Sequence, residues 1–123
     1  MTEPATHIVA LYGQRTRDAI DDFLEHAAMG ERLLSRGRQA LDTDETLQLA
    51  LEAIVFRLGE SVARMDQQFI DDHPDLALRD IKGARNIVAH QYHIIDHAIL
   101  WVGLERDLPP VVNGLRNLID DVT

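Results

Sequence analysis

The chain of 123 residues contains no cysteine, which excludes a disulfide framework and a thiolate metal site. We therefore expect a reducing, cytoplasmic setting. No apolar run approaches the roughly 18 residues that a membrane-spanning helix needs, so no membrane segment is predicted. The first thirteen residues lack a basic segment followed by a continuous apolar one, so no signal peptide is predicted either.

Aromatic residues and positive charge are also scarce. Aromatic residues make up 5% of the chain, and 12 Lys and Arg stand against 21 Asp and Glu, a formal net charge of −9. The prevalence of Leu, Ala, Ile and Val favours packed helices over a sheet. The acidic balance predicts poor general affinity for nucleic acid, so phosphate would have to be met in a local cleft. Arg79, Lys82 and Arg85, spaced three residues apart, provide such a local series.

The spacing of apolar residues predicts two helices in the first half of the chain. The first starts within Thr6–Arg17 and ends at about Arg36. Asp42 and Glu45 have the spacing of a capping box, which predicts the start of the second helix. Its apolar residues recur every three or four positions as far as Phe69, and the His73-Pro74 step ends it.

The second half predicts three more helices. The first spans about Ala77 to His93, and a joint follows near Ile94-Ile95. Asp96 is expected to cap the next helix, which Pro109-Pro110 stops before a last helix from Val111 to Asp121.

These elements predict an all-α fold, an antiparallel bundle of four to five helices in a single domain over residues 1–123. Trp101 lies beside Ile99 and Leu104, which favours packing in the core or an interface. Stacking on a base is the alternative for this indole.

Residues 85–92 read RNIVAHQY and are the strongest candidate for chemistry. On one helix, at about 100° per residue, Arg85, Asn86, His90 and Tyr92 fall on one polar arc of about 160°. Asn86 lies four residues before His90 and is expected to hydrogen-bond its imidazole. A guanidinium, an imidazole and a phenol suit the binding of a phosphodiester and the transfer of a proton. The plainer interpretation is a solvated helix face.

Histidines recur after the motif and raise the alternative of a metal site. His90, His93 and His97 lie three and four residues apart, with Asp96 nearby. A break near residues 94–95 would move His97 off the helix, so we predict no metal and no cofactor.

Arg85-x4-His90-x-Tyr92 resembles the signature of HEPN-domain proteins, in particular their HepT-like branch. The segment around Gly59-Glu60, the His73-Pro74 turn and the run through Trp101 to Pro109-Pro110 are similar to that family as well. The resemblance covers Arg17 to the C-terminus. Residues 1–16 form an N-terminal extension outside it.

The resemblance implies a toxin of a HEPN/MNT toxin–antitoxin system: a metal-independent endoribonuclease that leaves a 2′,3′-cyclic phosphate. Arg85 and His90 would be catalytic, and Asn86 and Tyr92 supporting. The implied partners are a second copy of the chain, an MNT-type nucleotidyltransferase antitoxin that adenylylates Tyr92, and an RNA substrate, with tRNA a candidate. Neither DNA nor a membrane is implied. The alternative is a catalytically inactive HEPN bundle that only binds a nucleotidyltransferase, and the acidic balance favours it.

Overall fold

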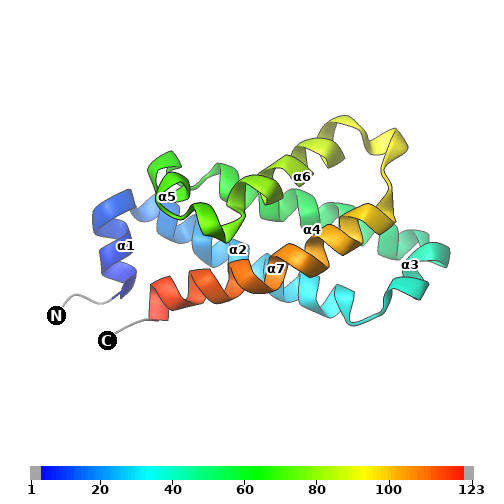
Figure 1. Ribbon diagram of the computed structural model, residues 1–123, viewed down its shortest axis with the longest axis horizontal. Helices are drawn as coiled ribbons and strands as arrows, with labels where there is room; N and C mark the ends of the chain where they lie inside the picture. Colours follow the sequence, from blue (N-terminus) through cyan, green and yellow to red (C-terminus); the bar gives the residue numbers. More distant parts are fainter. Residues whose placement is uncertain (1–3, 121–123) are drawn as a thin grey trace.

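The structure, a computed structural model, describes residues 4–120, without the side chains of residues 4–6, Tyr92 and Asp120. Four long helices run back and forth along one axis: α2 (Gln14–Leu34), α4 (Glu45–Ala63), α6 (Leu78–His90) and α7 (His97–Asp120) (Figure 1). The described residues contain no strand. The predicted all-α bundle is confirmed.

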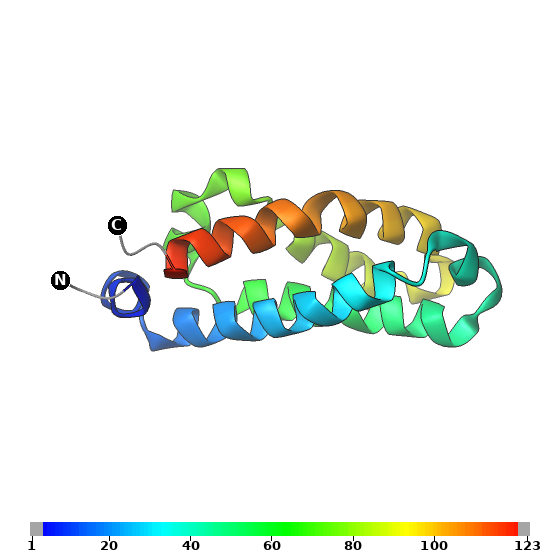
Figure 2. The same cartoon turned by 90° about the horizontal axis from the view of Figure 1, so that it is seen from below.

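Short helices join and cover the long ones. They are α1 (Pro4–Tyr12), α3 (Arg38–Thr43), α5 (Gln67–Asp72) and the 3-10 turns η1 (Pro74–Leu76) and η2 (Tyr92–Ile94). Figure 2 shows α1 end-on, lying across the end of the bundle near both termini. Its Ile8 is buried in the same core as the long helices, so the described part of the N-terminal extension, residues 4–16, packs as part of the bundle.

Helix α4 lies at the centre, in contact with α2, α6 and α7. Its apolar residues at spacings of three and four are buried, and the side chains from α2 and α7 close over them. Trp101 is 1% exposed, which confirms that it packs in the core and removes base stacking as its role. Helix α6 packs chiefly on α4, and this contact positions the motif.

The predicted boundaries were wrong at three points in the first half. Gly13, at φ 95°, separates α1, which was not predicted, from α2, which begins inside the predicted window. Asp42 does not cap: it lies inside the unpredicted α3, and Asp44 accepts from the Leu47 amide at 3.1 Å. Helix α4 ends at Ala63 rather than continuing to Phe69, because Asp66 starts α5 by accepting from the Gln68 amide.

Two further boundaries differ in the second half. Helix α6 ends at His90, ahead of a run of aromatic and β-branched residues, which lowers helix propensity. Pro109 and Pro110 lie inside α7 and do not stop it. The residues whose carbonyls lose their donors, Glu105 and Arg106, are exposed to water, while buried residues on both sides hold the helix in place. The predicted cap is confirmed, because Asp96 accepts from the Ala98 amide at 3.0 Å.

Candidate active site

Arg85 is held where α6 crosses α4. A Cβ placed on Gly59 would lie 2.2 Å from the Arg85 Cβ and 2.9 Å from its Cγ, so only glycine allows this approach. The stem of Arg85 therefore packs on α4. The side chain is 20% exposed, on the edge of the buried face and not on the polar front that the helix pattern predicted.

Three hydrogen bonds orient the Arg85 guanidinium. Its Nη1 donates to Glu60 Oε1 at 2.9 Å, in an ion pair between α6 and α4. Its Nε and Nη2 donate to Asn86 Oδ1 at 3.1 and 2.7 Å. A guanidinium carries five N–H groups, so one N–H of Nη1 and one of Nη2 are left to bind another acceptor. The group is a fork held by three hydrogen bonds, with two N–H groups that have no partner among the described residues.

Asn86 has a different partner from the one predicted. Its amide oxygen accepts from Arg85 and not from His90. Because an amide is planar, the Nδ2 group then points away from Arg85. Asn86 positions the arginine rather than the imidazole.

His90 is the last residue of α6 and is exposed. Its imidazole has no hydrogen bond with the described residues, so both ring nitrogens are open to a ligand. Five residues along a helix turn about 140° and rise about 7.5 Å, so Arg85 and His90 of one chain diverge. The prediction that they share one face with Tyr92 was wrong, since Tyr92 opens η2 beyond the helix. The Tyr92 side chain is outside the described residues.

The three histidines that suggested a metal site lie on different elements. His90 ends α6, His93 lies in η2 and His97 begins α7. The His97 Nε2 lies 2.8 Å from Glu52 Oε2 on α4 and so ties the start of α7 to the core. Among residues 4–120, no group of three His, Cys, Asp or Glu could hold a metal ion.

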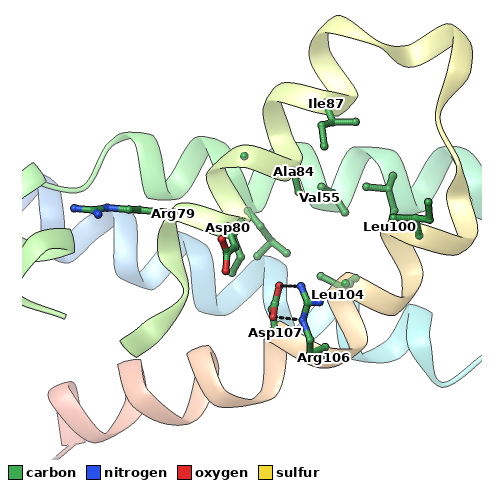
Figure 3. Close-up of a pocket in the computed structure, with 14 residues that line it drawn as sticks. Val55, Arg79, Asp80, Ala84, Ile87, Leu100, Leu104, Arg106 and Asp107 are labelled. Atoms are coloured by element: carbon green, nitrogen blue, oxygen red, sulfur yellow. Dashed lines mark hydrogen bonds and ion pairs between the residues drawn. The ribbon is translucent and has the colours of Figure 1, made fainter. Parts of the chain in front are cut away.

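A groove of about 560 Å³ separates α6 from α7 on the other flank of the motif helix. Figure 3 shows Ala84 and Ile87 on one wall, Leu100 and Leu104 on the other, and Val55 behind them. At one end the Asp107 carboxylate accepts from Arg106 Nε at 2.7 Å, and this raises the pKa of Arg106 above its ordinary value. The groove is mainly apolar, and of its two carboxylates, Asp80 and Asp107, the second is paired with Arg106.

Gly59 and Glu60 shape the site but were not predicted as site residues. Their signal was a glycine followed by an acid inside a segment whose apolar residues recur with helical spacing. Such a glycine lowers helix propensity and therefore indicates a close contact. The partner in that contact could be identified only after α4 and α6 had been aligned in space.

Comparisons with known proteins identify the family of the chain. The family described as "Ribonuclease HepT-like" matches residues 16–118. "Putative RNase MJ1380" of Methanocaldococcus jannaschii is 30% identical over 54 residues, which cover 44% of this chain and 50% of the relative. "Putative RNase MJ1216" of the same organism is 22% identical over 65 residues, covering 53% and 54%. "Putative RNase TTE0752" of Caldanaerobacter subterraneus is 21% identical over 62 residues, covering 50% and 55%.

The alignments span about half the length of these curated relatives. No solved structure matches the chain. Within residues 4–120, no helix is both long enough and apolar enough to cross a membrane.

Proposed function

The chain belongs to the HepT-like ribonuclease family, and from this premise we propose that it is a metal-independent endoribonuclease, the toxin of a HEPN/MNT toxin–antitoxin system. The observation that carries the proposal is the Arg85 guanidinium, held by Glu60 and Asn86 with two N–H groups that have no partner among the described residues. It lies on the same helix, α6, as an exposed histidine, His90. Two fixed donors and a free imidazole are the groups that phosphodiester cleavage requires.

The proposed reaction is an attack by the RNA 2′-hydroxyl on its adjacent phosphorus. His90 takes the hydroxyl proton as the P–O2′ bond forms, and Arg85 stabilises the charge that builds on the non-bridging oxygens. The P–O5′ bond breaks, and a second, protonated His90 gives its proton to the departing oxygen. The products are a 2′,3′-cyclic phosphate and a 5′-hydroxyl. DNA lacks the nucleophile and is not cut.

Two copies of the chain are needed, because one imidazole cannot readily serve both oxygens of one phosphate. The 140° between Arg85 and His90 supports the same conclusion, since one chain does not converge both groups on one phosphorus. A dimer surface is available beside the motif. Ile99 is 69% exposed and Ile87 46% exposed on the two sides of the apolar groove, and burying them in a symmetric contact would bring two motif helices together.

The proposed regulator is an MNT-type nucleotidyltransferase that transfers adenylate from ATP to the Tyr92 phenol and releases pyrophosphate. Tyr92 follows His90 by two residues, so adenylate on its phenol would obstruct the site formed by Arg85 and His90 and would repel the RNA phosphate. The other tyrosine is a poor competitor. The Tyr12 hydroxyl donates to Asp72 at 2.7 Å, and this bond raises the pKa of Tyr12 to about 12.

The rival function is an inactive bundle that only binds its nucleotidyltransferase. The net charge of −9 favours it, as does the ion pair in which Glu60 already neutralises Arg85. The free N–H groups of Arg85 favour the nuclease. Growth arrest on expression of this chain alone supports the nuclease and contradicts the inactive bundle.

The test is to sequence RNA ends after expression of the chain, and after incubation of purified protein with total RNA. The wild type should leave 2′,3′-cyclic phosphate ends and remain active in EDTA, and His90→Ala should leave none. His7→Ala, an exposed histidine on α1, is the matched control and should behave as wild type. Activity that EDTA removes and Zn²⁺ restores would instead support metal-dependent hydrolysis.

A further inference from the structure

Lys82 differs from the two other basic residues of α6. Arg79 is paired with Asp71 and Arg85 with Glu60, whereas Lys82 forms no ion pair with a carboxylate of the described residues. It is also the only lysine in the sequence. In a chain with so many acids, a half-buried lysine without an acidic partner needs another explanation.

Lys82 lines a hollow of about 290 Å³ between α6, α5 and the end of α4. Val62 and Ile70 contribute apolar walls, and Gln67, Arg79, Lys82 and Asn86 contribute the polar ones. The hollow and the apolar groove lie on neighbouring flanks of α6, where Arg79 and Gly83 line both. Lys82 and Asn86 are one helical turn apart, so their polar ends reach the hollow together.

The hollow offers donors and no open carboxylate of its own. The Asn86 oxygen accepts from Arg85, which leaves its Nδ2 group as a donor. Asp71, at the margin, is already engaged, because Gln67 and Arg79 both donate to it and hold its pKa below the ordinary value. An ammonium and an amide N–H₂ without acceptors, beside a guanidinium, favour an anion.

We propose that this hollow binds the phosphodiester next to the one that is cut, with Lys82 as the charge that holds it and Asn86 as the second donor. The inference rests on the proposed function, since it assigns a second contact on the same RNA strand. Asn86 links the two positions, because its oxygen accepts from Arg85 and the same residue lines the hollow. A strand held at two successive phosphates is fixed in register, which determines which bond reaches Arg85 and His90.

The test uses an RNA oligonucleotide whose cleavage site has been mapped with the wild type. Lys82→Gln removes the charge, Lys82→Arg keeps it, and Arg116→Gln removes an exposed arginine on α7 that does not line the hollow. Lys82→Gln should raise KM roughly 3- to 10-fold and lower the slope of log affinity against log salt by about 0.7, the value expected for one phosphate contact on a single strand. Lys82→Arg should keep both KM and the salt slope close to the wild-type values.

Neutral methylphosphonates placed one at a time beside the cleavage site locate the contact. In the wild type, one position should raise KM, and in Lys82→Gln the same position should have no further effect, since the two changes remove one interaction. If Lys82→Gln behaves as Arg116→Gln does, or if it stays sensitive to that methylphosphonate, the hollow is not the subsite, although the nuclease stands.

Failure of the nuclease itself would look different. If the wild type cuts no RNA, binding of a fluorescent oligonucleotide decides the inference. If the affinity for the oligonucleotide depends on Lys82, the phosphate site is supported in a chain that binds RNA without cutting it. A complete lack of RNA binding would overturn both proposals.

Discussion

Gly59→Ala tests whether the approach of α4 to α6 holds the active arginine. The added Cβ would lie 2.2 Å from the Arg85 Cβ, and an ordinary contact begins at 3.4 Å. The two helices would have to separate locally by the difference, 1.2 Å, because a Cβ is fixed to its backbone and cannot rotate away. Arg85 would then lose its alignment with Glu60, which lies on the same helix as the new methyl group.

Two effects on stability oppose each other. Alanine is favoured over glycine inside a helix by about 1 kcal/mol, whereas overpacking a close contact costs about 1–3 kcal/mol. The free energy of unfolding should therefore fall by up to about 2 kcal/mol. The effect on catalysis should be larger, since a shift of about 1 Å in a catalytic group can cost about 100-fold in rate.

Gly114→Ala is the matched control. Its Cβ would also lie 2.2 Å from a neighbour, but that neighbour is Leu76 Cδ2, the end of a side chain that can rotate. Urea unfolding and RNA cleavage should be measured for both variants. Gly114→Ala should stay close to wild type in both, and Gly59→Ala should lose activity while still folded. If Gly59→Ala cleaves RNA at the wild-type rate, the close contact is not needed to hold Arg85.

Three other predictions concern the proposed dimer, the adenylylation of Tyr92 and the hydrogen bond between Tyr12 and Asp72. Ile99→Glu should convert the dimer to a monomer in light scattering and abolish cleavage, whereas Leu49→Glu, similarly exposed at 66%, should do neither; a dimer that survives Ile99→Glu would place the interface elsewhere. Adenylate added by the partner enzyme should map to Tyr92 by peptide mass spectrometry, and a map to Tyr12 would refute the regulatory role. Tyr12→Phe should lower the thermal midpoint near pH 7 and have little effect below the folded pKa of Asp72. The reason is that the Tyr12 bond lowers that pKa, so its stabilisation is present above the ordinary value and lost in acid. If Tyr12→Phe lowers the thermal midpoint equally at pH 7 and at pH 2, the hydrogen bond does not act through the ionisation of Asp72.

The sequence was sufficient to predict helices at α2, α4 and α6, because each must bury an apolar stripe, whereas α7 was predicted as two helices. Leu51, Leu58 and Val62 recur with helical spacing and are all fully buried in α4. Short helices carry no such signal. Helix α3 has one buried residue, Leu41, in six positions, so neither its existence nor the cap at Asp44 could be read from periodicity.

Tertiary packing overrode local preference at Pro109-Pro110. The pair ought to end a helix, yet Leu108 and Val111 on its two sides are fully buried and continue one apolar stripe. Burial of that stripe outweighs the two missing amide donors, which would have served exposed residues. Local sequence rules could not compare the burial of the stripe with the loss of the two amide donors, because the burial depends on which helices pack against α7.

The orientation of Arg85 was the main error within the candidate site. A helical wheel places every charged residue on the solvent side by default, and Arg85 was assigned there with His90. The aliphatic stem of Arg85 instead packs against α4, because Gly59 has no side chain and leaves room for it. The identities of Arg85, Asn86 and His90 follow from the motif, but the partners of each depend on how α4 and α6 are aligned.

The acidic net charge and the proposed RNA chemistry are compatible, because the position of each cation and its ion pairing matter more for binding a phosphate than the net charge of the chain. Several cations are already neutralised within the bundle, as in Arg17 with Asp21 and Arg64 with Asp22. These pairs add nothing to the attraction of RNA, and the excess acids oppose it at long range. On the motif helix, what remains for a phosphate is the two Arg85 N–H groups without a partner among the described residues, and Lys82, which forms no ion pair there. We therefore expect an acidic chain with so few phosphate contacts on α6 to have little affinity for RNA in general, and to select strands that can place successive phosphates along one flank of this helix.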